Sequence, residues 1–291
     1  MYRYPSQTEK GVRQASYAII LFMVANALGI VFILALMPLL AEVLTLPPGG
    51  VPSAGFFGGL IAVAAAGCGL LVVELVGAIL GLLAVIAIHR GKMEFGPGHS
   101  EKVDHAVLAL IGGILVPIIG GIFAGSVGSI VPSVSLVSAA AGASAGIVGA
   151  ILMGLFLLWT VEGLAAPDKR QLGVIALIVG VAAGVAALVA NVFVLYTVPI
   201  PTRPQDFSVL LVVPSVVGSG ISLISVGLWY VVYRSVLDRF RRGELQAIPP
   251  VPMYPMPYAP PYAPYYPPPY VPAPPPQPPA QPPPQNPPPN P

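Results

Sequence analysis

The sequence predicts an all-α protein: a polytopic transmembrane helical bundle of six spans, followed by a disordered proline-rich C-terminal tail. Only 8% of its 291 residues are charged and 56% are hydrophobic, whereas about 25% of the residues of an ordinary soluble domain are charged. Six apolar runs each reach the roughly 20 residues that a helix needs to cross a hydrocarbon core of about 30 Å. So few charges could not cover a soluble protein, so we expect lipid to be the solvent of these helices.

Each span is predicted from one continuous apolar run. The approximate boundaries are Ser16–Leu40, Phe57–Ile88, Ala106–Val131, Val137–Thr160, Gly173–Val198 and Val209–Tyr233. The second run is longer than a bilayer requires, so its helix is expected to tilt or to project. The third and fourth runs are separated only by PSVSL, and one re-entrant unit is the alternative to two crossings. The segment before the first run contains Glu9 and no cleavage site follows it, so this run is expected to stay as a membrane helix.

Lysine and arginine are distributed unevenly between the two ends of the predicted spans. Twelve of the thirteen lie at the N-terminus, in the connections after the second and fourth spans, or after the sixth span; only Arg203 lies in the other set of connections. That other set is short, rich in proline and nearly uncharged, as in LPPGGVPSAG. Because cytoplasmic loops carry the excess of basic residues, the pattern predicts an even number of spans and both termini in the cytoplasm.

Composition divides the chain into three parts: a cytoplasmic N-terminal segment (residues 1–15), the six-span domain (16–245) and a tail (246–291). From Ile248 the tail is uncharged and holds 24 of the 37 prolines and six of the twelve tyrosines. Proline removes backbone donors, so we expect a disordered chain with local polyproline-II structure. The pieces PYAPPYAP and PPPY are typical of segments that dock in the aromatic grooves of partner proteins. Such a composition also yields these patterns by chance, so a plain spacer is the alternative.

Small residues recur at four-residue spacing in four of the spans. The pairs are Gly77 and Gly81, Gly121 and Gly125, Gly142 and Gly146, Ala150 and Gly154, and Gly180 and Gly184. Such pairs let helix backbones approach closely in lipid. We favour packing within one bundle, and the alternative is a homo-oligomer formed through the same faces. Pro117 and Pro214 lie inside the third and sixth spans, where each should kink its helix.

The order of these features resembles that of a known family. EKGVRQ leads into the first span, AIHRGKMEF ends the second before a GPG-containing loop, and LWTVEGLAAPDKRQLGVI ends the fourth. Together with the Pro/Tyr-rich tail, this layout is similar to that of an uncharacterised archaeal family of multi-spanning membrane proteins, domain of unknown function 973. The resemblance covers roughly residues 8–245. It implies an archaeal plasma membrane and supplies no activity or site residues.

All three histidines fall in the charged connection after the second span, among acidic residues. Histidine and carboxylate side chains can together hold a transition metal. If Ser100 caps the following helix, Glu101 and His105 lie four residues apart on one face. No HxH or HxxxH spacing is present, so we favour a solvated loop and regard His99, Glu101 and His105 as weak metal candidates.

No sequence signature points to an enzyme, a cofactor or a nucleic acid. A hydrolase elbow, a P-loop and a dinucleotide fingerprint are all missing, so we predict a non-enzymatic protein without a cofactor. Basic residues are not interleaved with aromatic ones, so nucleic acid is not an expected partner. The single cysteine, Cys68, lies in an apolar run, where it is expected to be a small packing residue.

Glu74 stands in the middle of the second span, in the stretch GLLVVELVGAILG. At 1.5 Å per residue it lies about 21 Å from the inner end of that span, with Asn26 at about 15 Å and Asn191 at about 27 Å. No deep cation is present to pair with it, so hydrocarbon favours the neutral acid, which can exchange hydrogen bonds with an asparagine. We therefore predict that these three polar residues hold the bundle together. The alternatives are a site that handles protons or cations, and a lipid-facing side chain.

Two functions follow from these observations. The favoured one is an integral membrane protein, without catalytic activity, that displays a cytoplasmic Pro/Tyr-rich tail for a protein partner. The alternative is a small ion, proton or solute transporter that uses Glu74. A membrane enzyme is disfavoured because Glu74 has no second catalytic group at its depth.

Overall fold

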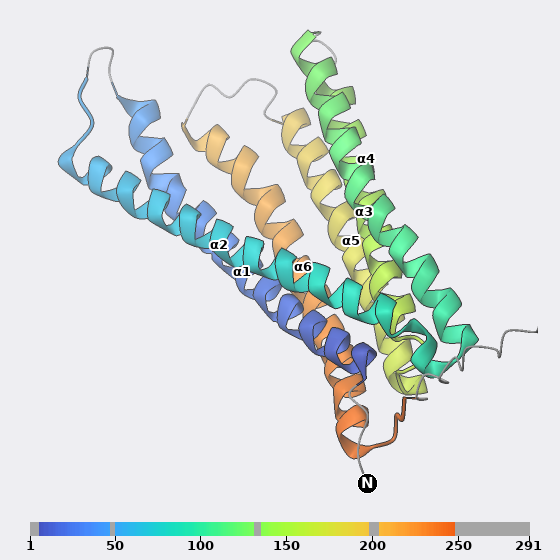
Figure 1. Ribbon diagram of the computed structural model, residues 1–291. Helices are drawn as coiled ribbons and strands as arrows, with labels where there is room; N and C mark the ends of the chain where they lie inside the picture. Colours follow the sequence, from blue (N-terminus) through green and yellow to red (C-terminus); the bar gives the residue numbers. More distant parts are fainter. Residues whose placement is uncertain (1–5, 47–49, 131–134, 198–203, 248–291) are drawn as a thin grey trace, which may run out of the picture. The chain divides into compact units, whose positions relative to one another are not determined.

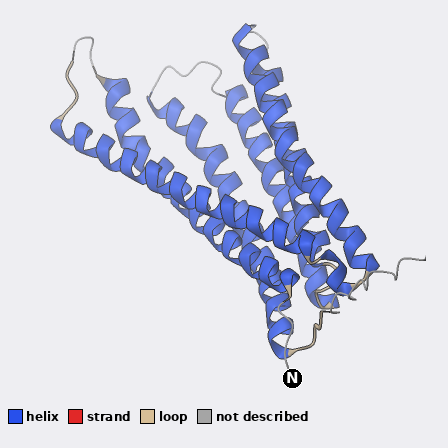
Figure 2. Cartoon of the chain, viewed as in Figure 1, coloured by secondary structure: helices blue, strands red, loops and turns tan. Residues whose placement is uncertain are grey.

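The computed structural model describes residues 6–46, 50–130, 135–197 and 204–247. These residues form six long α-helices and one short 3-10 helix (Figure 1). The elements are α1 (Gln7–Thr45), α2 (Ala54–Arg90), η1 (Lys92–Phe95), α3 (Pro97–Ile130), α4 (Ser135–Val161), α5 (Pro167–Thr197) and α6 (Pro204–Arg242). No strand occurs in the described ranges (Figure 2). The predicted all-α class is therefore confirmed, while the predicted tail lies outside the described residues from 248 onwards.

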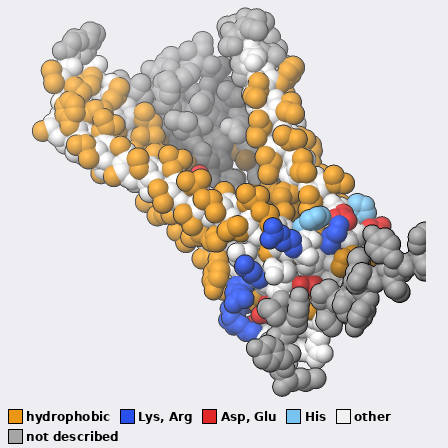
Figure 3. All heavy atoms as spheres, viewed as in Figure 1, with side chains coloured by type: hydrophobic (Ala, Val, Ile, Leu, Met, Phe, Trp, Pro, Cys, Tyr) orange, Lys and Arg blue, Asp and Glu red, His pale blue; other side chains and the backbone are white. Residues whose placement is uncertain are grey.

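Each long helix contains a stretch that is long and apolar enough to cross a membrane. Large apolar side chains lie exposed along these stretches: Ile61, for example, is 70% exposed and Leu71 is 64% exposed. Figure 3 shows hydrophobic side chains on the surface along most of the length of the helices in view. In water, each such side chain would gain about 1.5–3 kcal/mol from burial. The six helices therefore indicate a multi-pass integral membrane protein.

The helices extend beyond the predicted spans, chiefly where charged connections follow. α1 begins at Gln7 rather than at Ser16, and α6 ends at Arg242 rather than at Tyr233. Hydropathy marks only the apolar part of a helix, whereas its ends depend on capping and turn residues. The third and fourth predicted spans form two separate helices, and each has a membrane-spanning stretch.

The order of the helices in space differs from their order in the sequence. α2 packs on α1, α1 on α6, α6 on α5, α5 on α4, and α4 on α3. α2 and α3 are consecutive in sequence but make little contact with each other. α2 therefore has one extensive neighbour, α1, and most of its surface is left to the surroundings.

The main buried core lies near the charged connections. Its members come from the first half of α1, the last turns of α2 and α6, α5, and the end of α4 with the residues that follow it. They are Val12, Ala15, Ile19, Ala84, Val161, Leu164, Ala176, Trp229, Val232, Tyr233, Val236, Leu237 and Phe240. The fully buried Tyr233 hydroxyl lies 2.6 Å from the Thr160 hydroxyl and 3.2 Å from the Leu157 carbonyl oxygen. This core joins α4 and α6 by polar as well as apolar contacts.

Glycines bring neighbouring helices of the bundle into close contact. A Cβ built on Gly154 of α4 would lie 2.2 Å from the Leu177 side chain of α5, and one built on Gly184 of α5 would lie 3.2 Å from Ile147 of α4. These small residues thus serve the packing of α4 on α5. By contrast, open space surrounds the Cβ position of Gly81, Gly121 and Gly146.

Candidate functional site

Polar side chains gather where α1, α3 and α5 begin and where α2, α4 and α6 end. We call this region, residues 6–16, 86–106, 160–172 and 233–247, the charged end. Figure 3 shows Lys, Arg, Asp, Glu and His side chains together at one end of the surface. The alternating direction of consecutive helices produces this gathering, because every second connection returns to the same side.

Glu94 is a buried acid of the charged end. It lies in η1 and is only 8% exposed. Its carboxylate accepts hydrogen bonds from Ser6 Oγ at 2.6 Å, from the backbone N–H of Gln7 at 2.8 Å and from that of Thr8 at 3.1 Å. The first N–H groups of a helix have no helical carbonyl to pair with, and the helix dipole favours a negative charge beside them. Glu94 therefore caps α1 from a distant part of the chain.

Ser6 completes this cap. Its hydroxyl accepts from the Glu9 N–H at 3.0 Å while it donates to Glu94. Next to it, Thr8 Oγ1 donates to the carbonyl of Gly91 at 3.0 Å. A Cβ built on Gly91 would lie 2.4 Å from Thr8 Oγ1 and 2.6 Å from the Thr8 nitrogen. Only glycine therefore lets the end of α2 come so close to the start of α1.

The turn from η1 into α3 depends on Gly96. Its φ of +89° lies in the region that favours glycine. Pro97 then opens α3, as proline commonly does at the first helical position. The expectation that Ser100 caps this helix is wrong, because the helix starts earlier and the Ser100 N–H already donates to the Gly96 carbonyl at 3.2 Å.

The three weak metal candidates lie on α3 but do not form one site. His99 is 5% exposed, and its ring stands edge-on to Phe95 with the centroids 5.7 Å apart. His105 is exposed and lies 6.0 Å from the Trp159 ring, and Glu101 is also exposed. Within the described residues, no group of three His, Cys, Asp or Glu side chains is placed to hold a metal ion.

His99 is a buried polar group whose hydrogen bonds are not made. Neither ring nitrogen has a partner among the described atoms. Buried side chains of this kind normally have at least one partner. Its ring nevertheless packs edge-on against Phe95.

Ion pairs join neighbouring helices at the charged end. Glu162 follows α4 and pairs with Lys102 of α3 at 3.0 Å and with Arg170 of α5. Its side chain is only 10% exposed, so these pairs are screened less than pairs in open water. Lys92 donates to both carboxylate oxygens of Asp104 at 2.8 Å. These contacts fix the connections between α2 and α3 and between α4 and α5.

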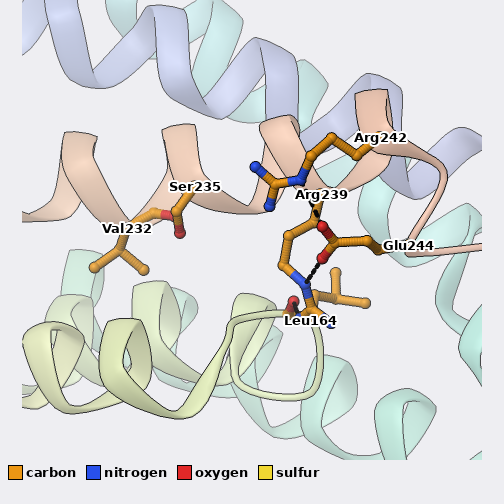
Figure 4. A network of polar contacts seen from close by, with 6 residues as sticks. All are labelled: Leu164, Val232, Ser235, Arg239, Arg242 and Glu244. Carbon is orange, nitrogen blue, oxygen red and sulfur yellow. Dashed lines mark hydrogen bonds and ion pairs between the residues drawn. The ribbon is translucent and has the colours of Figure 1, made fainter.

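A closed turn ends α6 (Figure 4). Gly243, at φ +75°, donates its N–H to the Phe240 carbonyl at 3.0 Å, and Glu244 donates its N–H to the Arg239 carbonyl at 3.1 Å. These are the two hydrogen bonds of a Schellman motif. The Glu244 side chain also pairs with Arg242 and, at 3.0 Å, with Arg239. Hydrogen bonds from Arg242 and then Arg239 lower the pKa of the Glu244 carboxyl below its usual range.

Arg239 also links this turn to the connection between α4 and α5. Its Nη1 donates to the carbonyl of Leu164, a residue of the main core (Figure 4). Leu245, just after the turn, packs against the same core. The chain is thus held in place up to the point where the predicted tail begins.

The three predicted intramembrane residues are not joined by hydrogen bonds. Asn26 donates to the Phe22 carbonyl at 2.8 Å and Asn191 donates to the Ala187 carbonyl at 2.9 Å, each within its own helix. Glu74 is exposed, and no described residue forms a hydrogen bond with it. The expected bonds between Glu74 and the amides are therefore not made. For Asn191 the reason is that α2 packs chiefly on α1, whereas α5, which carries Asn191, packs on α4 and α6.

Glu74 and Asn26 nonetheless lie at a similar level. Gly77 of α2 faces Leu21 of α1. Because the two helices are antiparallel, Glu74, one turn before Gly77, falls level with residues 24–26. The carboxyl and the amide are therefore on adjacent helices at similar depth.

Comparison with known proteins does not identify a relative: no family model, no curated protein and no solved structure matches the chain. The resemblance to domain of unknown function 973 therefore stays a prediction from the layout of the sequence.

The role of Glu94 is not predicted by the sequence. Glu94 is one of several acids in the charged connection after the second span, although two local signals point to a cap. Ser6 followed by Glu9 fits the S-x-x-E pattern of a helix start, and the glycines at 91 and 96 bracket a tight turn around Glu94. Neither signal indicates that the two segments meet.

Proposed function

We propose that the protein is a non-enzymatic anchor in the plasma membrane that displays its Pro/Tyr-rich tail in the cytoplasm to a protein partner. One observation carries this proposal: Glu244 and Arg239 close the end of α6, and Arg239 ties that end to Leu164. If the end of α6 were frayed, the position at which the tail leaves the helix would not be defined. A closed end fixes the start of the tail to the charged end, which by its excess of basic residues fits the cytoplasmic side.

The chemistry of the tail suits recognition by an aromatic groove. Proline-rich segments are already extended, so binding costs them little conformational entropy. The tail carries tyrosines among its prolines and no charge, so its binding should depend little on salt. Repeated Pro/Tyr pieces on one membrane anchor would also raise the effective concentration for a partner with several grooves.

The proposal is tested with three forms of the full chain in native membranes: the intact protein, a truncation after Ala247, and a variant whose six tail tyrosines are serine. The tyrosines are Tyr254, Tyr258, Tyr262, Tyr265, Tyr266 and Tyr270. Crosslinking followed by purification should recover a partner with the intact protein alone, and a synthetic peptide of residues 251–272 should displace it. Recovery of the same proteins with all three forms would show that the tail is a spacer.

A second candidate, transport of a small ion, proton or solute, is supported by the common level of Glu74 and Asn26. A carboxyl and an amide at one depth could pass a proton or bind a cation. Proteoliposome flux tests this candidate: Glu74→Gln cannot ionise, so it should abolish flux without changing thermal unfolding. Equal flux in wild type and variant would eliminate the role of Glu74.

A further inference from the structure

Three basic side chains at the charged end have no acidic partner among the described residues. Every other Lys and Arg among the described residues has a carboxylate oxygen within 3.6 Å. The exceptions are Lys10, Arg13 and Arg90, and all three are exposed. Their charge is therefore available to an anion from outside the described part of the chain.

The three unpaired cations lie on two helix ends that touch each other. Lys10 and Arg13 are in the first turns of α1, and Arg90 is the last residue of α2. Between the two α1 cations, Gly11 fits against the last turn of α2: a Cβ built on it would lie 2.5 Å from Ile88 Cγ1. The start of α1 thus rests directly on the end of α2. Lys10 and Arg13 lie within two residues of Gly11, and Arg90 lies two residues after Ile88.

An exposed stripe continues from the cations along α1. Tyr17, four residues after Arg13, is 54% exposed. Val24, Leu28 and Val31 follow, and all are exposed. Steps of three, four or seven residues keep side chains on one face of a helix. The face therefore presents, in order, two cations, a tyrosine and an apolar strip.

α2 carries a parallel stripe behind Arg90. Ile86, Leu83, Ile79 and Val76 precede it at steps of three and four residues, and all are exposed. Because α1 packs on α2 along their length, the two apolar strips run along the same pair of helices. Cations stand at one end of both strips.

We propose that this face of α1 and α2 binds an anionic phospholipid. Lys10, Arg13 and Arg90 would hold its phosphate, and its acyl chains would lie along the two apolar strips. Tyr17, about 6 Å further along α1 than Arg13, would lie at the boundary between headgroup and chains, where amphipathic aromatic rings are enriched. The order of chemical groups along the helices matches the order along such a lipid.

The test uses purified full-length protein in detergent and measures the binding of phosphatidylglycerol, phosphatidylcholine and inorganic phosphate by native mass spectrometry. The variant Lys10→Gln/Arg13→Gln/Arg90→Gln removes the three unpaired cations. The control Lys169→Gln/Arg234→Gln/Arg241→Gln removes the same net charge from cations that already have partners on the protein surface.

Wild type should bind phosphatidylglycerol more tightly than phosphatidylcholine. Each cation near an anionic headgroup contributes roughly fivefold, so the triple variant should weaken phosphatidylglycerol binding on the order of 100-fold. The control should stay within about threefold of wild type. Circular dichroism checks folding, and the single variant Arg90→Gln, expected to lose about fivefold, serves if the triple variant does not fold.

Three outcomes would overturn the proposal. Equal losses in the two triple variants would mean that net charge alone attracts the lipid. Equal affinity of wild type for the two lipids would mean that the headgroup is not recognised. Binding of inorganic phosphate as tight as that of phosphatidylglycerol would identify a site for a free anion, with no part for the apolar strips.

Discussion

Glu94 places a negative charge where α1 needs one. A cap is usually supplied by the residue just before the helix, and Ser6 has that position here. Glu94 adds a second cap from η1, with a carboxylate between one side-chain and two backbone donors. Because Ser6 and Thr8 are buried, their donor groups would be left without a partner if the carboxylate were removed.

Glu94→Ala should therefore destabilise the protein by roughly 3 kcal/mol, since unpaired buried donors cost about 1–3 kcal/mol and more when the lost partner is charged. Thermal unfolding in detergent measures the loss. Glu101→Ala, seven residues away and exposed, is the matched control and should change stability by less than about 0.5 kcal/mol. Equal stability of the two variants would contradict the capping role of Glu94.

Glu74 should not contribute to the stability of the bundle. An exposed acid on a membrane helix costs on the order of 3 kcal/mol at the bilayer centre, and no bond to a described residue offsets this cost. We expect Glu74→Leu to unfold at the same temperature as wild type or at a higher one. The gain in the free energy of unfolding should be at most about 3 kcal/mol. A loss of stability in this variant would restore the hypothesis that Glu74 holds helices together.

At the scale of the helices, close backbone contact distinguishes glycines that look alike in sequence. Gly146 and Gly149 are both on α4. A Cβ on Gly149 would lie 2.3 Å from Pro117 Cγ of α3, whereas one on Gly146 would meet no atom within 4 Å. The four-residue spacing of small residues highlighted Gly146 but not Gly149, because spacing cannot tell which face of a helix meets a neighbour.

We expect Gly149→Ala to destabilise the protein by about 1–3 kcal/mol through overpacking of α3 against α4. Gly146→Ala should instead be neutral or stabilising by up to about 1 kcal/mol, because alanine is the better helix former. Thermal unfolding of the two variants side by side checks this prediction. Similar changes in unfolding temperature for both variants would show that α3 and α4 are packed less closely at Gly149 than in the structure.

The end of α6 should loosen in acid. The pKa of the Glu244 carboxyl is lowered in the folded protein by Arg242 and Arg239, so its stabilisation is complete above the ordinary value of about 4.3. It is lost as the pH falls below that value, through the lowered pKa of the folded state. The protection factors of the Gly243 and Glu244 N–H groups against hydrogen exchange should therefore fall in this range, and Glu244→Gln should remove this pH dependence. Unchanged protection factors in acid would argue against these ion pairs.

The sequence was sufficient to predict the six helices but not their ends or their contacts. Apolar runs reveal a membrane helix because lipid demands about 20 apolar residues. The start of α1 at Gln7 was missed because it depends on Ser6 and on Glu94, which is 88 positions from Ser6. Glu74 lies within the stretch of α2 that is long and apolar enough to cross a membrane, but its lack of a bond to Asn191 follows from helix neighbours that one sequence does not reveal.

At the scale of the whole molecule, the buried core and the polar contacts share one end. Trp229, Tyr233 and Phe240 of the core lie within a few turns of the ion pairs at the end of α6. We propose that this end faces the cytoplasm and that the tail leaves from it.

Cysteine accessibility in intact cells tests this central claim most directly. In a Cys68→Ala background, single cysteines replace Gly50 between α1 and α2, Met93 at the charged end, or Gln277 in the tail. Met93 is a suitable site because its side chain is 63% exposed. An impermeant thiol reagent should label the Gly50 variant from outside and should label the other two only after the cells are broken. Labelling of the Met93 or Gln277 variant in intact cells, or failure to label Gly50, would contradict the account.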